Sequence, residues 1–157
     1  MARDPINDMT DDEQIAKIKH YSYYFKHIET PSEKVQLAAV KENGTLLKDI
    51  ANPSSKVRLA ALKNWGGAIE YLQNPSQKEI VTAVRDWPGA IKYVHNLDAA
   101  TATILKPEII KYMLTLLKDS ESKDEQGYRL IVEMIKMLSK IVNWPEIDMI
   151  KKSQDID

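Results

Sequence analysis

Basic side chains recur in this sequence at two positions that repeat every 22 residues. The first set of cations comprises Lys34, Lys56 and Lys78, and the second set comprises Lys41, Lys63 and Arg85. Each member of the second set follows a member of the first by seven residues. On an α-helix seven residues return to within about 20° of the start. If the copies stack, the two sets form parallel basic rows that could bind an acidic partner.

Three interpretations of these rows stay open. They could bind the acidic surface of another protein, or a nucleic-acid backbone, or they could simply keep one helix face solvated. Residues 14–96 hold twelve basic and seven acidic side chains, whereas the whole chain has a net charge of -1 and a pI near 6.3. Nucleic-acid-binding domains are usually far more basic than this, so the composition favours a protein partner over nucleic acid.

Two tryptophans, Trp65 and Trp87, share one position of the same 22-residue period, with glycines close by. Exposed indoles in that place could stack on bases or anchor a protein interface. Alternatively, each indole packs over the turn of the next copy. We expect packing, and we keep both residues as secondary candidates for partner contact.

The repeat itself predicts the architecture. Residues 31–52, 53–74 and 75–96 align without a gap, each starting with Pro-Ser and ending with Asn, and residues 9–30 form a degenerate fourth copy. Apolar spacing predicts, in each copy, a helix of about ten residues, a tight turn, a second helix of about seven residues and an Asn-Pro junction. Such short helices are marginal alone and must bury their apolar sides on one another. We therefore predict one all-α domain over residues 1–157, a short α-solenoid with HEAT-like stacking over 9–96.

Residues 97–157 are predicted to be capping helices with a charged tail. Pro107 should open one helix, a polar linker should span 120–127, and a longer helix should run from Tyr128 to about Val142 as the second arm of a hairpin. The wide apolar face of this longer helix includes Leu130, Met134, Met137 and Ile141. It either packs on both its hairpin partner and the last repeat, or it forms a homodimer. A structural homo-oligomer built through this hairpin is thus an alternative function.

The sequence also argues against several classes of protein. It has no cysteine, no apolar run of about 20 residues and an acidic N-terminus unlike a secretory signal, so we expect a cytoplasmic protein. No catalytic or nucleotide-binding motif occurs, and His20, His27 and His95 lack metal-ligand spacing. We therefore expect a binding protein that is not an enzyme and needs no metal or cofactor.

The repeat signature also carries a family resemblance. The pattern NPSxxVQLAAVKxNG, read in Pro31 to Gly44 and again in Asn52 to Gly66, resembles a short tandem helical repeat of unknown function found in phage and bacterial proteins. The resemblance covers residues 9–96, and the third copy departs from it at Glu79 and Trp87-Pro88. It implies a phage-encoded protein in the host cytoplasm that binds and modulates, or inhibits, a host macromolecule such as a defence factor. It implies no catalytic residue.

Overall fold

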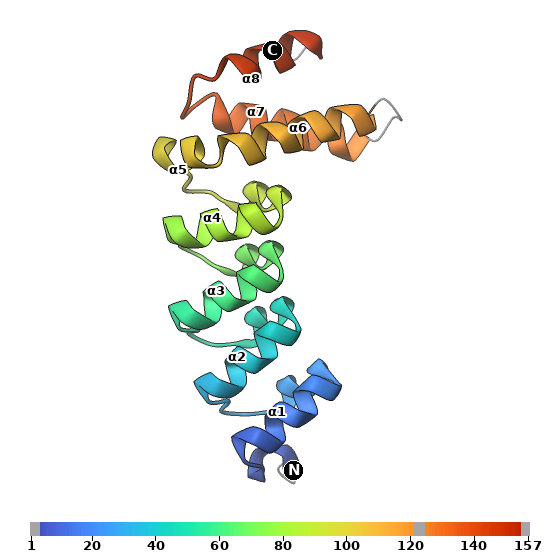
Figure 1. Ribbon diagram of the computed structural model, residues 1–157, viewed down its shortest axis with the longest axis vertical. Helices are drawn as coiled ribbons and strands as arrows, with labels where there is room; N and C mark the ends of the chain where they lie inside the picture. Colours follow the sequence, from blue (N-terminus) through green and yellow to red (C-terminus); the bar gives the residue numbers. More distant parts are fainter. Residues whose placement is uncertain (1–3, 121–124, 155–157) are drawn as a thin grey trace.

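The computed structural model describes residues 4–120 and 125–154, and over these ranges it contains helices and no strand. The prediction of an all-α helical repeat fold is confirmed. Figure 1 shows the helices of the repeats lying one above another along the long axis of the molecule, with longer helices at the C-terminal end. Each copy adds one α-helix to a first layer and one short 3₁₀ helix to a second layer.

The copies have the same local structure. The α-helices are α1 (Asp11–His20), α2 (Glu33–Glu42), α3 (Ser55–Asn64) and α4 (Gln77–Asp86), each of ten residues. Each is followed by a six-residue 3₁₀ helix: η2 (Ser22–His27), η3 (Gly44–Asp49), η4 (Gly66–Tyr71) and η5 (Pro88–Tyr93). The predicted second α-helix is therefore a 3₁₀ helix, because six residues between two extended cap residues suit this tighter form, which occurs in short pieces.

Serine side chains fix the start of each first helix. Ser32, Ser54 and Ser76 are the N-caps of α2, α3 and α4, and each hydroxyl accepts a hydrogen bond from the backbone N–H three residues later. Ser76 also forms a capping box with Glu79. The proline before each serine lies outside the helix, because the serine occupies the N-cap position. Asn52 is the one non-glycine residue with positive φ in the described part of the chain.

Glycines allow successive copies to approach each other closely. A Cβ atom on Gly66 would lie 2.2 Å from the carbonyl oxygen of Ala83 in the next copy. The Gly66 N–H donates to Asp86 Oδ2 at 2.6 Å, and the Gly44 N–H donates to Asn64 Oδ1 at 2.7 Å. We call these two hydrogen bonds the inter-repeat braces. Residue 88 occupies the same position in the third copy, where proline has no N–H to donate.

A short 3₁₀ helix, η1 (Pro5–Asp8), covers the N-terminal end of the stack, which the sequence did not predict. Its Ile6 is buried, and the Gln14 side-chain amide donates to the Ile6 carbonyl oxygen at 2.9 Å. Asn7 links η1 to the end of η2 by donating to the His27 carbonyl at 3.0 Å. The first copy is thereby closed on its open side, as terminal copies of stacked repeats require.

The C-terminal part consists of α5 (Ala99–Ile104), α6 (Lys106–Ser120), α7 (Glu125–Leu138) and α8 (Pro145–Ser153). The predicted hairpin is formed by α6 and α7, and α7 also packs on η5 of the last repeat. The expected helix end near Val142 is wrong, since α7 stops at Leu138 and turns follow. Of the predicted linker, residues 121–124 lie outside the described residues, and the rest is helical, since α6 extends to Ser120 and α7 begins at Glu125 instead of Tyr128.

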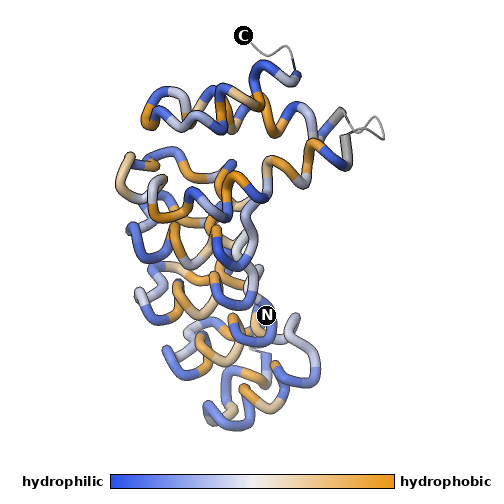
Figure 2. The backbone as a smooth tube through the Cα atoms, turned by 45° about the horizontal axis from the view of Figure 1, so that its top comes forward, coloured by the Kyte–Doolittle hydropathy of each residue, from blue (hydrophilic) through white to orange (hydrophobic). Residues whose placement is uncertain are grey.

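Buried apolar side chains form one cluster that extends from Ile6 to Ile150. Figure 2 shows hydrophobic segments in every copy and in the C-terminal helices. The repeated alanines of the first helices, Ala39, Ala61 and Ala83, are fully buried, as close packing of successive helices requires. Within the described ranges no helix has both the length and the apolar character needed to cross a membrane.

Candidate partner-binding face

The outer face of the first helices carries the predicted cations. We call Lys34, Lys56 and Lys78 the first cation row, and Lys41, Lys63 and Arg85 the second cation row. All six side chains are exposed. In each copy the two cations lie on the same face of the ten-residue helix, about two turns apart along its axis, because seven residues separate them. The stacking of α2, α3 and α4 then aligns them between copies.

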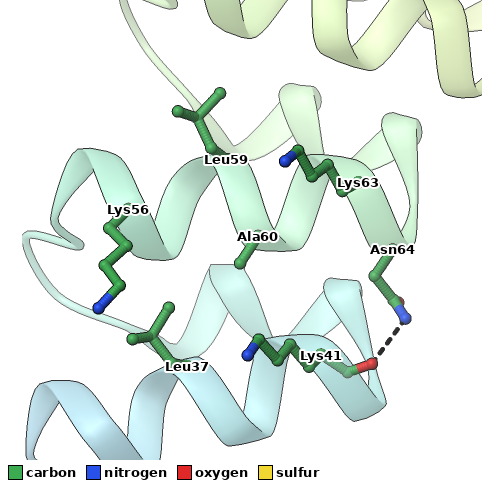
Figure 3. A pocket seen from close by; sticks show the side chains of 7 residues that line it. All are labelled: Leu37, Lys41, Lys56, Leu59, Ala60, Lys63 and Asn64. Atoms are coloured by element: carbon green, nitrogen blue, oxygen red, sulfur yellow. Dashed lines mark hydrogen bonds between the residues drawn. The ribbon is translucent and has the colours of Figure 1, made fainter.

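A hollow lies between the two rows. Its volume is about 480 Å³, and Lys41, Lys56 and Lys63 line it together with apolar side chains and Asn64. Figure 3 shows the three lysines around this hollow, with Leu37 contributed by α2 and Leu59 by α3. A second hollow of about 550 Å³ extends toward α1 and shares Leu37, Lys41 and Lys56 with the first. The surface is therefore continuous over α1, α2 and α3.

The base of this surface is apolar in every copy. We define the floor as the half-buried side chains at one repeat position, which lies three residues after the position of the first row and four residues before that of the second row. The floor comprises Ile15, Leu37, Leu59 and Val81. The floor can be recognised in the sequence, since an apolar residue recurs between the two cations with the same period of 22 residues. The sequence interpretation expected the helices to bury their apolar sides, and Ile15, Leu37 and Val81 do pack against the core, but it did not include these partly exposed side chains in the candidate face.

Charge on the face is concentrated in its middle. At the ends, Lys34 Nζ lies 2.6 Å from Asp12 Oδ1, and Arg85 Nε lies 3.2 Å from Glu108 Oε1. The hydrogen bond and charge of Lys34 lower the pKa of Asp12, and the same contact raises the pKa of Lys34.

Four other cations differ from these end members. Over residues 4–120 and 125–154, no carboxylate lies within 4.0 Å of the four ammonium groups between the ends. These four residues are Lys41, Lys56, Lys63 and Lys78. Lys19 on α1 adds a further exposed cation to the second row. The unpaired positive charge is thus centred on α3.

An ion pair joins the second and third copies at a position where the third copy departs from the repeat pattern. Glu79 stands where the two preceding copies have Val57 and Val35, and it is only 3% exposed. Arg58 Nη2 of the preceding copy donates to Glu79 Oε2 at 2.8 Å, and Arg58 Nε lies 2.8 Å from Oε1. The carboxylate also accepts hydrogen bonds from the N–H and hydroxyl of Ser76, both at 2.8 Å. A charge that would be costly alone is therefore paired and hydrogen-bonded.

The two tryptophans lie away from the hollow. The indole of Trp65 covers Gly67, where an added Cβ would come within 2.3 Å of the ring, and its centroid is 6.2 Å from that of Tyr71. Trp87 repeats this arrangement on Gly89. Both indoles are half-buried. Each therefore packs against its own copy, a neighbour that the sequence interpretation did not predict, and their role in partner contact stays a prediction.

The candidate interface on α7 is largely covered within the chain. Met134 is buried, whereas Leu130, Met137 and Ile141 are half-buried. More exposed apolar side chains lie elsewhere at this end, with Leu114 on α6 and Met149 on α8 at 46% and 70% exposure. The packing of α7 on α6 and η5 matches the first of the two predicted arrangements, and a homodimer stays a prediction.

Comparisons with known proteins add no family. No protein-family model, curated protein or solved structure matches this chain. The resemblance to a phage and bacterial repeat stays an expectation from the sequence. Among the described residues, no group of three or more metal-ligating side chains is placed to hold an ion. The face formed by the two rows and the floor is therefore the candidate functional site.

Proposed function

We propose that this protein is a non-enzymatic protein-binding module that recognises an acidic partner through the face formed by the two cation rows. One observation carries the proposal. Lys41, Lys56 and Lys63 surround a largely apolar hollow, and together with Lys78 they have no carboxylate within 4.0 Å among the described residues, although Glu33 and Glu42 line the adjoining hollow. Unpaired cations beside partly exposed hydrocarbon can gain both electrostatic and apolar contacts from a partner.

The alternative of a merely solvated face accounts for the lysines but not for the floor. Single exposed apolar side chains are normal on protein surfaces. Here, however, a half-buried apolar residue stands between two cations in each of the three regular copies, at Leu37, Leu59 and Val81. Ile15, Leu37 and Val81 also pack against the buried core, and their exposed parts leave hydrocarbon between the cations that a partner could cover, so the combination supports binding.

The repeat resemblance extends the proposal to a biological setting. On that basis we propose a phage-encoded protein that acts in the host cytoplasm and modulates or inhibits a host macromolecule, such as a defence factor. Nucleic acid is the rival partner, because two rows of cations also suit a phosphate backbone. Binding to nucleic acid should weaken steeply with salt, with a log-log slope of roughly one per phosphate contact.

Charge reversal on the face tests the proposal. We expect K41E/K63E to abolish capture of the partner from host extract by the tagged protein, because four units of charge change at the hollow. The matched control, K136E/K140E, makes the same change on exposed lysines of α7 and of the turn that follows it. Circular dichroism should show equal helical content for both variants. Capture that survives K41E/K63E, or that nuclease treatment removes, would overturn the proposal.

A further inference from the structure

The distance between the two cation rows is the width of an α-helix. Seven residues along a helix correspond to about 10.5 Å, and a helix with its side chains is about 10–12 Å wide. The floor residue of each copy stands between the two cations, as Leu59 stands between Lys56 and Lys63. A helix that lies along the stack would therefore rest on the floor with one cation row on each side.

The repeat distance along the stack also fits a helix. Packed helices are about 8–10 Å apart, so Leu37, Leu59 and Val81 should span about 20 Å. On a partner helix, side chains seven residues apart are separated by about 10.5 Å. One apolar side chain per heptad could then meet each floor residue over three copies. The partner segment would need about 15–20 residues.

The floor selects against an extended chain. Ala38 and Ala60 lie beside its leucines in the two hollows. The hydroxyl of Thr82, which takes the alanine position in α4, already donates to the Lys78 carbonyl at 2.7 Å. An extended backbone pressed against such a floor would lose hydrogen bonds to water without replacement, which is costly. A helix satisfies its own backbone groups.

The charges select an acidic helix. The cations nearest the hollow, on α2 and α3, are unpaired among the described residues, whereas Lys34 and Arg85 at the ends are neutralised by Asp12 and Glu108. Acidic side chains on both flanks of a partner helix would face one row each. Stacking of bases is not favoured here, since the floor is aliphatic and Trp65 lies against Gly67 instead.

We infer that the face binds an amphipathic α-helix of about 15–20 residues whose apolar stripe rests on the floor and whose Asp or Glu side chains flank the stripe on both sides. This inference rests on the proposed function and specifies the chemistry and conformation of the partner. Helix-in-groove recognition reads apolar anchors at helical spacing. The two rows add a requirement for acid on both sides of those anchors.

Designed peptides test this inference with the full chain. The probe is a fluorescein-labelled 18-residue peptide of Leu, Glu, Ala and Gln, with a leucine stripe at helical spacing and glutamates on both flanks. A second peptide has the same composition in scrambled order, and 20-nucleotide single- and double-stranded DNAs serve as nucleic-acid probes. In anisotropy titrations we expect the stripe peptide to bind at least tenfold more tightly than the scrambled peptide and than either DNA.

Variants of the floor and of the rows should separate the two parts of the face. We expect A60Q, which fills the hollow with a good helix former, to weaken binding of the stripe peptide about tenfold and to leave the scrambled peptide unchanged. K41E/K63E should weaken both peptides. L116S, at a half-buried leucine of α6, is the control for loss of apolar area. Thermal melts verify that each variant folds. L59S removes the apolar side chain of the floor directly, and A60Q keeps the test valid if L59S unfolds the chain.

Each outcome decides between defined alternatives. Equal affinity for the stripe and scrambled peptides would overturn the helix inference while leaving an acidic protein partner in place. The same conclusion would follow if neither peptide bound but row-dependent capture of the native partner persisted. Tighter binding of either DNA than of both peptides would overturn the inference and the proposed function together. A tenfold preference that A60Q and K41E/K63E both reduce would support the inference.

Discussion

The repeats α1–α4 and the C-terminal helices α5–α8 solve the problem of burying apolar side chains differently. Each ten-residue helix of the repeats buries side chains against its neighbours on both sides, small ones such as Ala61 together with large ones such as Leu62. The C-terminal helices α6 and α7 instead pair with each other and bury large side chains, such as Ile131 and Met134. The repeats thus present the same combination of cations and floor residues in successive copies. The hairpin has no such repeated surface and covers one end of the stack.

The junction between the two regions explains why the pattern stops there. The inter-repeat braces need an N–H at the residue after the turn tryptophan or asparagine, and Pro88 has none. Arg85 pairs with Glu108 of α6, and η5 packs on both α6 and α7. The last repeat is therefore attached to the hairpin by contacts of a different kind from those between copies.

The largest expected effect concerns the close approach of copies, which the hairpin does not use. In G66A the new Cβ would meet the Ala83 carbonyl oxygen at 2.2 Å, so α4 must shift. We expect a loss of about 3 kcal/mol in the free energy of unfolding, the upper part of the range for overpacking. G44A is the matched control, and we expect a smaller loss, since its Cβ would lie 2.8 Å from the Ala61 carbonyl oxygen. Urea denaturation checks both, and an equal loss in the two variants would contradict this explanation.

The next effect concerns the buried ion pair between the second and third copies. R58Q leaves the Glu79 carboxylate buried without its cation, and we expect a loss of about 2 kcal/mol, below the usual cost because Arg58 is partly exposed. R58Q/E79V restores the Gln and Val found one copy earlier, at Gln36 and Val57. We expect this double variant to recover most of the stability in thermal melts. A double variant no more stable than R58Q would show that the pair is not compensatory.

A smaller effect is expected for the inter-repeat braces. The Asn64 side chain accepts from the Gly44 N–H and donates to the Lys41 carbonyl at 2.8 Å. N64A removes both hydrogen bonds and leaves a buried N–H unpaired, so we expect a loss of about 1 kcal/mol. D86N, which keeps an acceptor for the Gly66 N–H, should cost less. Denaturant titration of both variants measures the difference, and a D86N loss equal to that of N64A would argue against the braces.

The smallest effect concerns the pKa values of two tyrosines, one in the repeats and one in the C-terminal helices. A hydrogen bond to the Glu70 carboxylate, together with burial, raises the pKa of Tyr71 to about 12. For Tyr112 on α6, burial is the main cause that raises the pKa. Tyrosine in an unfolded chain titrates near 10, so both groups contribute stability that is present below about pH 10 and is lost as the pH rises further. E70Q should lower the pKa of Tyr71 and leave that of Tyr112 unchanged in a spectrophotometric titration.

Much of the fold could be predicted because the period of 22 residues imposes the same local signals in each copy. The serine caps, the ten-residue helices and the capping box of Ser76 follow from nearest neighbours in the sequence. The 3₁₀ form of the second helices could not be derived in this way, since the apolar spacing that indicated a short helix does not distinguish a 3₁₀ helix from an α-helix. The cover provided by Ile6 was also missed, because the polar segment around it gave no helical period.

The candidate face was predicted only in part for a similar reason. The cations could be placed on one side by counting along a helix, but the role of Leu37 and Leu59 depends on how deeply the stack buries them. Partial burial is a property of the assembled copies and has no signature within one helix. Pairing of Lys34 with Asp12 likewise joins equivalent positions of adjacent copies, so the local sequence does not show which lysines stay unpaired.

The equivalence of the two inter-repeat braces has a consequence for how this protein can change in length. Because the copy from Pro53 to Asn74 meets both neighbours through matching glycine contacts, duplication of that 22-residue segment would insert a new unit without disturbing either end. Each insertion would lengthen the outer face by one unit of the same chemistry. A gene of this kind can therefore adjust how much of a target it spans separately from what it recognises.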